Sequence, residues 1–178
     1  MYNRISSIRK IAYTGLFIAI SIILTRFFSG NITIAGIYAL RLTFGEIPII
    51  LNGLLLGPVF GAACGILSDI IGYAINPLGG AYFPGFTLTA MLTGLIPGVL
   101  SKYFLKELKW HSIAIIIVLT ELMAVPLNTL WLSLLHGKAY ITLLVPRIIG
   151  KGILIPVYII IITMTAKHIR HIFSFTRR

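Results

Sequence analysis

The stretch LRLTFGEIPIILNGLLLGPVFGAACGILSDIIGY, residues 40–73, combines evenly spaced small residues with an aspartate inside an apolar segment. Small residues at this spacing let helices approach closely in a membrane, where lipid provides no hydrophobic drive for helix association. We therefore expect the second and third helices to pack tightly, with a break at Gly57-Pro58, because proline suits the first turn of a new helix. The small residues of the stripe are Gly53, Gly57, Gly61, Gly65, Ser68 and Gly72.

The composition of the whole chain predicts an all-α membrane protein. Of its 178 residues, 58% are hydrophobic and only 11% are charged, whereas soluble domains have about 45–50% apolar and about 25% charged residues. We expect a single integral membrane domain over residues 1–178. The net charge of +11 does not indicate a nucleic-acid partner, because the basic residues lie at the ends of apolar segments, where orientation signals belong.

The hydrophobic pattern predicts six transmembrane helices, since a spanning helix needs roughly 20 apolar residues. The second segment is short, a loop is expected over residues 28–42, and a Gly/Pro-rich loop over 76–85. Six spans put both termini on one side. Ten of the 15 Lys and Arg residues lie on that side, which predicts that both termini are cytoplasmic. The expected spans are 8–27, 43–57, 58–75, 86–104, 112–136 and 144–166.

Two acidic residues, Asp69 and Glu121, fall near the middle of predicted spans. An ionisable residue there costs roughly 2.5–3.5 kcal/mol on insertion scales, so each should face the protein interior or a watered cavity. Either carboxyl could instead make only a structural hydrogen bond. Asn128 and Trp131 share a face of the fifth span, and Arg147 and Lys151 lie four residues apart at the start of the sixth.

Together the outer cations, aromatic rings and hydrogen-bonding groups suit a flat, anionic, polar small molecule. Taken singly, the aromatic residues are equally typical of an interfacial belt. The candidate substrate-binding residues are Arg26, Arg41, Asp69, Tyr82, Phe83, Phe86, Asn128, Trp131 and Arg147.

Motifs for catalysis and for ATP binding are missing from the sequence. There is no phosphate loop of the G-x-x-x-x-G-K-[ST] type, no G-x-S-x-G turn and no H-E-x-x-H zinc motif. We therefore expect no enzymatic activity, no metal and no cofactor. The first span carries the small residues Ala12, Gly15 and Ala19 on one face, which is either an internal packing face or a docking face for another membrane subunit.

The run over residues 41–73 resembles the substrate-binding S components of energy-coupling factor (ECF) vitamin transporters, and GGAYFPGFTLTAMLTGLIPG, residues 79–98, resembles their folate-specific branch. The resemblance implies a six-helix subunit of the bacterial plasma membrane that binds its vitamin near the outer face. It also implies a complex with a transmembrane coupling subunit and two ATPases that supply ATP hydrolysis. The small-x-x-x-small motif of the family's first helix contacts the coupling subunit, and here Gly15 and Ala19, with Ala12 on the same face, fit it.

Other functions stay open from the residues alone. The same outer residues would suit another anionic vitamin such as pantothenate, because the chemistry of the side chains does not select folate. An intramembrane enzyme is disfavoured by the lack of a nucleophile–base pair. A purely structural membrane protein is disfavoured by the ionisable residues inside the spans.

Overall fold

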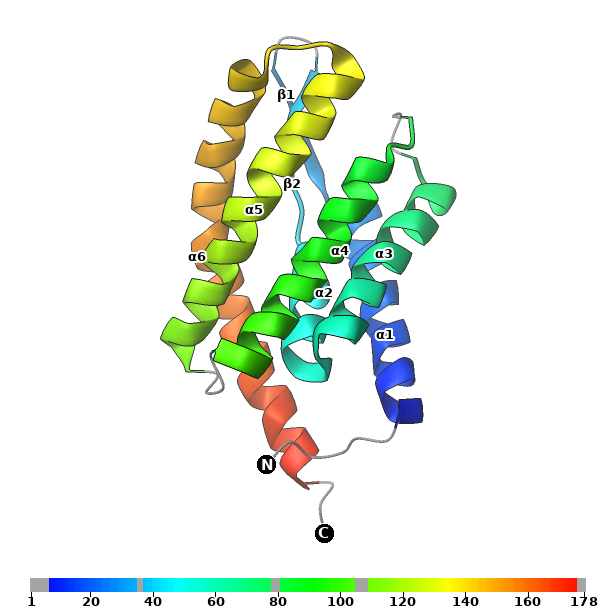
Figure 1. Ribbon diagram of the computed structural model, residues 1–178, viewed down its shortest axis with the longest axis vertical. Coiled ribbons are helices and arrows are strands. Elements are labelled where there is room, and N and C mark those ends of the chain that lie inside the picture. Colours follow the sequence, from blue (N-terminus) through cyan, green and yellow to red (C-terminus); the bar gives the residue numbers. More distant parts are fainter. Residues whose placement is uncertain (1–6, 35–36, 78–80, 105–108, 176–178) are drawn as a thin grey trace.

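The computed structural model describes residues 7–34, 37–77, 81–104 and 109–175. Within these residues the chain forms six α-helices, as the sequence predicts, together with a two-stranded hairpin and a π-helical turn, η1 (Leu100–Phe104). The helix α1 begins and α6 ends at the same end of the bundle, and the hairpin lies toward the other end (Figure 1). The elements are α1 (Ser7–Arg26), β1 (Gly30–Ile34), β2 (Ile37–Leu42), α2 (Glu46–Leu56), α3 (Pro58–Ile75), α4 (Pro84–Val99), α5 (Trp110–His136) and α6 (Tyr140–Phe175).

Among the described residues, five helical stretches are long and apolar enough to cross a membrane: Ser7–Arg26, Pro58–Ile75, Pro84–Tyr103, Trp110–His136 and Tyr140–His168. The chain is therefore a multi-pass membrane protein.

The second predicted span, residues 43–57, forms the short apolar helix α2, the sixth helix of the predicted count. It has 11 residues, about 16 Å at 1.5 Å per residue, and is therefore shorter than a hydrocarbon core about 30 Å thick. Nine of its residues are buried, because a helix that is apolar on all sides is covered on all sides. It begins about halfway along the bundle and runs toward the end where α6 finishes, although α6 extends beyond it (Figure 1).

The expected loop over residues 28–42 contains the antiparallel hairpin β1–β2. Its strands pair from Gly30 opposite Leu42 to Ile34 opposite Ile37, with an irregularity in register between Ile32 and Thr33. The sequence around Ile32 is rich in β-branched residues, which favour strands. Strand pairing satisfies backbone polar groups that would be costly in a region poor in water. The strand β2 packs against α6 and leads into α2.

The predicted close packing of the glycine stripe is confirmed, but its main partner is α4. A Cβ atom on Gly94 of α4 would lie 2.0 Å from the carbonyl oxygen of Gly61 in α3. A Cβ on Gly65 would lie 2.0 Å from the oxygen of Ala90. The helix α2 shares this contact, since a Cβ on Gly53 would lie 2.2 Å from the Gly94 oxygen. Backbone therefore meets backbone where α2, α3 and α4 converge.

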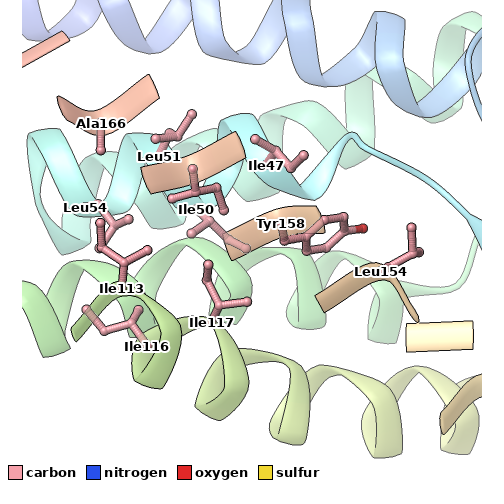
Figure 2. Packing of buried hydrophobic residues seen from close by; sticks show 11 residues of the cluster. Ile47, Ile50, Leu51, Leu54, Ile113, Ile116, Ile117, Leu154, Tyr158 and Ala166 are labelled. Carbon is pink, nitrogen blue, oxygen red and sulfur yellow. The ribbon is translucent and has the colours of Figure 1, made fainter. Parts of the chain in front are cut away.

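The largest apolar core joins α2 to α5 and α6 (Figure 2). It anchors one side of α2, while the glycine contacts hold the other. Its buried members are Ile47, Ile50, Leu51, Leu54, Ile113, Ile116, Ile117, Leu154, Tyr158, Ile162 and Ala166.

Candidate functional site

The turn between β2 and α2 is held by hydrogen bonds from two other helices. Ser21 of α1 donates its hydroxyl to the carbonyl oxygen of Gly45 at 2.8 Å. Tyr158 of α6 donates its hydroxyl to the carbonyl oxygen of Thr43. The backbone N–H of Gly45 donates to the Thr43 hydroxyl at 3.2 Å. These contacts fix the start of α2 and therefore the position of Glu46, its first residue.

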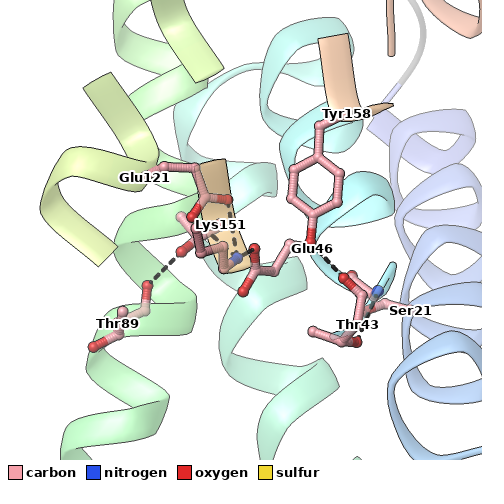
Figure 3. A network of polar contacts seen from close by, with 9 residues as sticks. Ser21, Thr43, Glu46, Thr89, Glu121, Lys151 and Tyr158 are labelled. Atoms are coloured by element: carbon pink, nitrogen blue, oxygen red, sulfur yellow. Dashed lines mark hydrogen bonds and ion pairs between the residues drawn. The ribbon is translucent and has the colours of Figure 1, made fainter. Parts of the chain in front are cut away.

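Three charged side chains from three helices meet beside this turn, and we call Glu46, Glu121 and Lys151 the ion cluster (Figure 3). The ammonium of Lys151 forms an ion pair with Glu46 and lies 3.0 and 3.2 Å from the two carboxylate oxygens of Glu121. It also lies 5.2 Å from the centroid of the Tyr158 ring. Removing such charges from water is costly unless they are paired, and ionisable residues inside a membrane typically mark a functional site.

The ion cluster has more carboxylates than ammonium groups. With all three groups ionised, two negative charges face one positive charge. Arg147 lies one helical turn before Lys151 on α6, and its guanidinium attracts Glu46 electrostatically. The structure therefore brings the predicted residue Arg147 next to the cluster.

An aromatic group, which we define as Phe83, Phe86 and Trp131, lies where α4 begins and α5 approaches its end. The ring centroids of Phe83 and Trp131 are 5.8 Å apart, and those of Phe83 and Phe86 are 6.1 Å apart. The indole N–H of Trp131 donates to the Thr89 hydroxyl at 3.0 Å. A Cβ on Gly85 would lie 2.5 Å from the indole, so glycine makes room for the ring. The structure thus assembles three predicted site residues.

The aromatic group and the ion cluster are neighbours. Figure 3 draws Thr89, which accepts the hydrogen bond of Trp131, in the same region of the bundle as Glu46, Glu121 and Lys151. A flat ligand on the aromatic rings would therefore lie within reach of charged groups.

Three further predicted residues have partners within the protein. The guanidinium of Arg26 donates to the carbonyl oxygen of Asn76 at 2.9 Å and lies 3.9 Å from a carboxylate oxygen of Asp69. Thr87 donates its hydroxyl to Asp69 at 2.6 Å, and the hydroxyls of Thr87 and Tyr82 are 2.8 Å apart. This chain of contacts ties the end of α1 to α3 and α4. Arg26, Asp69 and Tyr82 therefore stabilise the fold even without a ligand.

The structure gives less detail on the last two predicted site residues, Asn128 and Arg41. Asn128 is partly buried in α5. Arg41 lies in β2, but its side chain is outside the described part of the structure.

The small-residue face of α1 points away from the protein. Ala12, Gly15 and Ala19 are all exposed, and a Cβ on Gly15 would meet nothing within 4 Å. Of the two alternatives that the sequence left open, internal packing is therefore wrong for this chain.

Sequence reasoning missed Glu46 as a site residue, and noted Glu121 and Lys151 without joining them. A signal was available, because each of the three apolar segments carries at least one ionisable residue, and a buried charge is costly unless a charge of opposite sign lies beside it. What the sequence lacked was the position of α2, which decides that these three segments meet.

Comparison with known proteins gives a consistent family. The model of the family "ECF transporter, substrate-specific component" matches residues 9–166. The chain is 35% identical over 151 residues to the folate transporter FolT of Clostridium novyi (strain NT), covering 84% of this chain and 83% of the relative. It is 28% identical over 159 residues to the folate transporter FolT of Leuconostoc mesenteroides subsp. mesenteroides, covering 85% and 80%.

Solved structures agree with this result. A crystal structure of FolT bound with folic acid superposes with a TM-score of 0.77 and 32% sequence identity, covering 90% of this chain and 93% of that one. The S-component for biotin from an ECF-type ABC transporter superposes with a TM-score of 0.67, covering 92% of each chain, but at 18% identity it shows the fold alone. From its match to the family model over residues 9–166 and its similarity to these relatives, the chain belongs to the family of ECF transporter substrate-specific components.

Proposed function

We propose that the protein binds folate at the outer face of a bacterial plasma membrane and takes it up as the S component of an ECF-type transporter. The observation that carries this proposal is the similarity, at 32% identity and over 90% of the chain, to a crystal structure of FolT bound with folic acid. The curated relatives named FolT support the same ligand.

The chemistry of the candidate site suits folate. A pterin ring is flat and can stack on the aromatic group, and such aromatic pairs contribute about 0.5–1.5 kcal/mol beyond the area they bury. The pterin edge carries hydrogen-bond donors that suit a carboxylate, and the glutamate tail carries two carboxylates that suit arginine or lysine. We infer that Phe83, Phe86, Trp131, Asn128 and Arg147 line the site.

The other predicted residues have a supporting part in this proposal. Arg26, Asp69 and Tyr82 tie α1 to the start of α4, where Phe83 stands. We infer that they hold the aromatic group in place, and that Arg41 faces the ligand from β2.

Uptake needs partners, which we propose are a transmembrane coupling subunit and two ATPases, since the chain has no phosphate loop. The face formed by Ala12, Gly15 and Ala19 is the proposed docking surface for the coupling subunit. Its exposure and its small side chains support this assignment, because small residues allow two membrane helices to approach closely.

Calorimetric titration of the purified protein in detergent with folate, pantothenate and thiamine tests the ligand. Tight binding of folate without ATP is the expected result. Heat from pantothenate or thiamine and none from folate would assign the protein to another vitamin and overturn the proposal. Mass spectrometry of the small molecule that copurifies with the protein gives an independent identification.

A further inference from the structure

We propose that α6 carries a hinge between Gly152 and Pro156, and that the part of α6 before it, residues 140–151, swings as an arm that opens and closes the candidate site. This inference rests on the proposed function, because the arm would admit the folate that the site binds. Neither the family match nor the names of the relatives assign a moving part to this helix.

The backbone of α6 is weakened at the proposed hinge. Pro156 lies inside this 36-residue helix. Proline has no N–H group, so Pro156 cannot donate the helical hydrogen bond to the carbonyl oxygen of Gly152, four positions earlier. Its ring also crowds that carbonyl group, which kinks or breaks helices. Figure 1 shows α6 changing direction about midway along its length, as helices do at a proline.

Gly152 makes the same segment easier to bend. Other helical glycines of this chain, such as Gly61 and Gly94, lie where a Cβ atom would collide with the backbone of a neighbouring helix. Gly152 is exposed, and a Cβ there would meet no described atom within 4 Å. Close packing therefore does not account for this glycine, although alanine would favour the helix by about 1 kcal/mol. What glycine provides at this position is conformational freedom.

The two sides of the hinge are anchored differently. After the hinge, Tyr158, Ile162 and Ala166 belong to the largest apolar core and are at most 1% exposed. The arm contributes Leu143 to a small buried cluster with Leu132 of α5. Moving the arm would therefore disturb less buried apolar surface than moving the rest of α6. The exposed large apolar residues of the arm are Ile141, Val145, Ile148 and Ile149.

The free end of the arm contacts the candidate site. Phe86 of the aromatic group packs against the cluster of Leu143 and Leu132. The residues proposed to line the site are all partly buried, so a ligand as large as folate needs a covering element to move aside. A swing of the arm would withdraw Leu143 from Phe86 and uncover the aromatic group.

The ion cluster lies close to the pivot of this movement. Lys151, which pairs with Glu46 and Glu121, is the residue directly before Gly152. Leu143 lies eight residues earlier, about 12 Å farther along the helix at 1.5 Å per residue. A swing about the hinge therefore displaces Leu143 much more than Lys151, and the site can open while these ion pairs stay formed.

The test measures how fast folate binds to and leaves the purified protein in detergent, by stopped-flow tryptophan fluorescence. The hinge variants are Gly152→Ala, which stiffens the helix, and Pro156→Ala, which restores the missing N–H donor. Pro156 is exposed, so its replacement removes little packing. The control is Ile160→Ala, another change to a better helix former at an exposed position of α6, but after the hinge.

Gly152→Ala should slow both association and dissociation by about 5-fold, the rate factor that corresponds to the helix-propensity difference of about 1 kcal/mol. The dissociation constant should stay unchanged. The substitution raises the energy of the bent form through which folate enters and leaves, whereas it affects the closed forms with and without ligand equally. Pro156→Ala should slow both rates at least as much, and Ile160→Ala should leave both rates unchanged.

Three results would overturn the inference while leaving the proposed function standing. Unchanged rates in both hinge variants would show that the site opens elsewhere. A changed dissociation constant without parallel slowing of the two rates would show that the hinge residues act on the bound form. Equal slowing by Ile160→Ala would show that the effect is not particular to the hinge. By contrast, absence of folate binding by the wild type would count against the proposed function itself.

Discussion

Replacing Gly94 by alanine should measurably destabilise the protein, because the space for a methyl group is filled by backbone. The new Cβ would lie 2.0 Å from the carbonyl oxygen of Gly61, and the three nearest atoms all belong to the Gly61 backbone. No side chain can rotate away, so α3 and α4 would have to separate by roughly 1 Å. Overpacking of this kind costs about 1–3 kcal/mol. At about 2–4 °C per kcal/mol for a chain of this size, the melting temperature should fall by about 2–12 °C.

Thermal unfolding of the purified protein in detergent, followed by circular dichroism, measures this change. The matched control is Gly152→Ala in α6, because Gly152 is exposed and a Cβ there meets nothing within 4 Å. That control should be neutral or stabilising by up to about 1 kcal/mol, since alanine is the better helix former. Equal melting temperatures for Gly94→Ala, Gly152→Ala and the wild type would refute the reasoning that the α3–α4 contact has no room for a side chain.

Three other changes test the site and its surroundings. Trp131→Ala should weaken folate binding about 2- to 13-fold, the loss of about 0.5–1.5 kcal/mol of stacking; unchanged affinity by calorimetry would make this ring part of an interfacial belt. Gly15→Leu should leave folate binding by the isolated protein intact but abolish ATP-driven uptake in proteoliposomes with the partner subunits; a parallel loss of both would show that the face is not a docking surface. Asp69→Asn should lower the unfolding free energy by about 1–3 kcal/mol, because it weakens the partner of the buried guanidinium of Arg26; an unaltered melting temperature would contradict this role.

The helix count and the close helix contacts could be predicted from the sequence because both depend on local patterns. Apolar length defines the spans, and the four-residue spacing of Gly61 and Gly65 marks the face on which another backbone can approach. Which helix provides that other backbone depends on the tertiary arrangement. Gly94 of α4 fills the place. Its neighbours Ala90 and Gly98 repeat the four-residue spacing of the α3 stripe, but the spacing alone does not show which two faces meet.

The candidate site was predicted in part, for a related reason. Phe83, Phe86 and Trp131 were grouped correctly because they are conspicuous residues at the same end of two neighbouring helices. Arg26 and Asp69 are equally conspicuous, yet they are partners of each other. A sequence shows that a buried charge needs a partner but does not show which partner it will have.

The ion cluster follows from the shortness of α2. A spanning helix would have placed its first turn at the membrane surface, but an 11-residue helix begins about halfway along the bundle, after β2 has brought the chain inward (Figure 1). An acidic residue is favourable in the first turn of any helix, and here that turn is interior, so Glu46 is placed between α5 and α6. Lys151 and Glu121 then supply the charges that make its burial tolerable. Irregular backbone at membrane depth is tolerated where it is covered by protein or lines a cavity. The break between β2 and α2 is therefore also the place where an otherwise apolar bundle can contact a polar ligand.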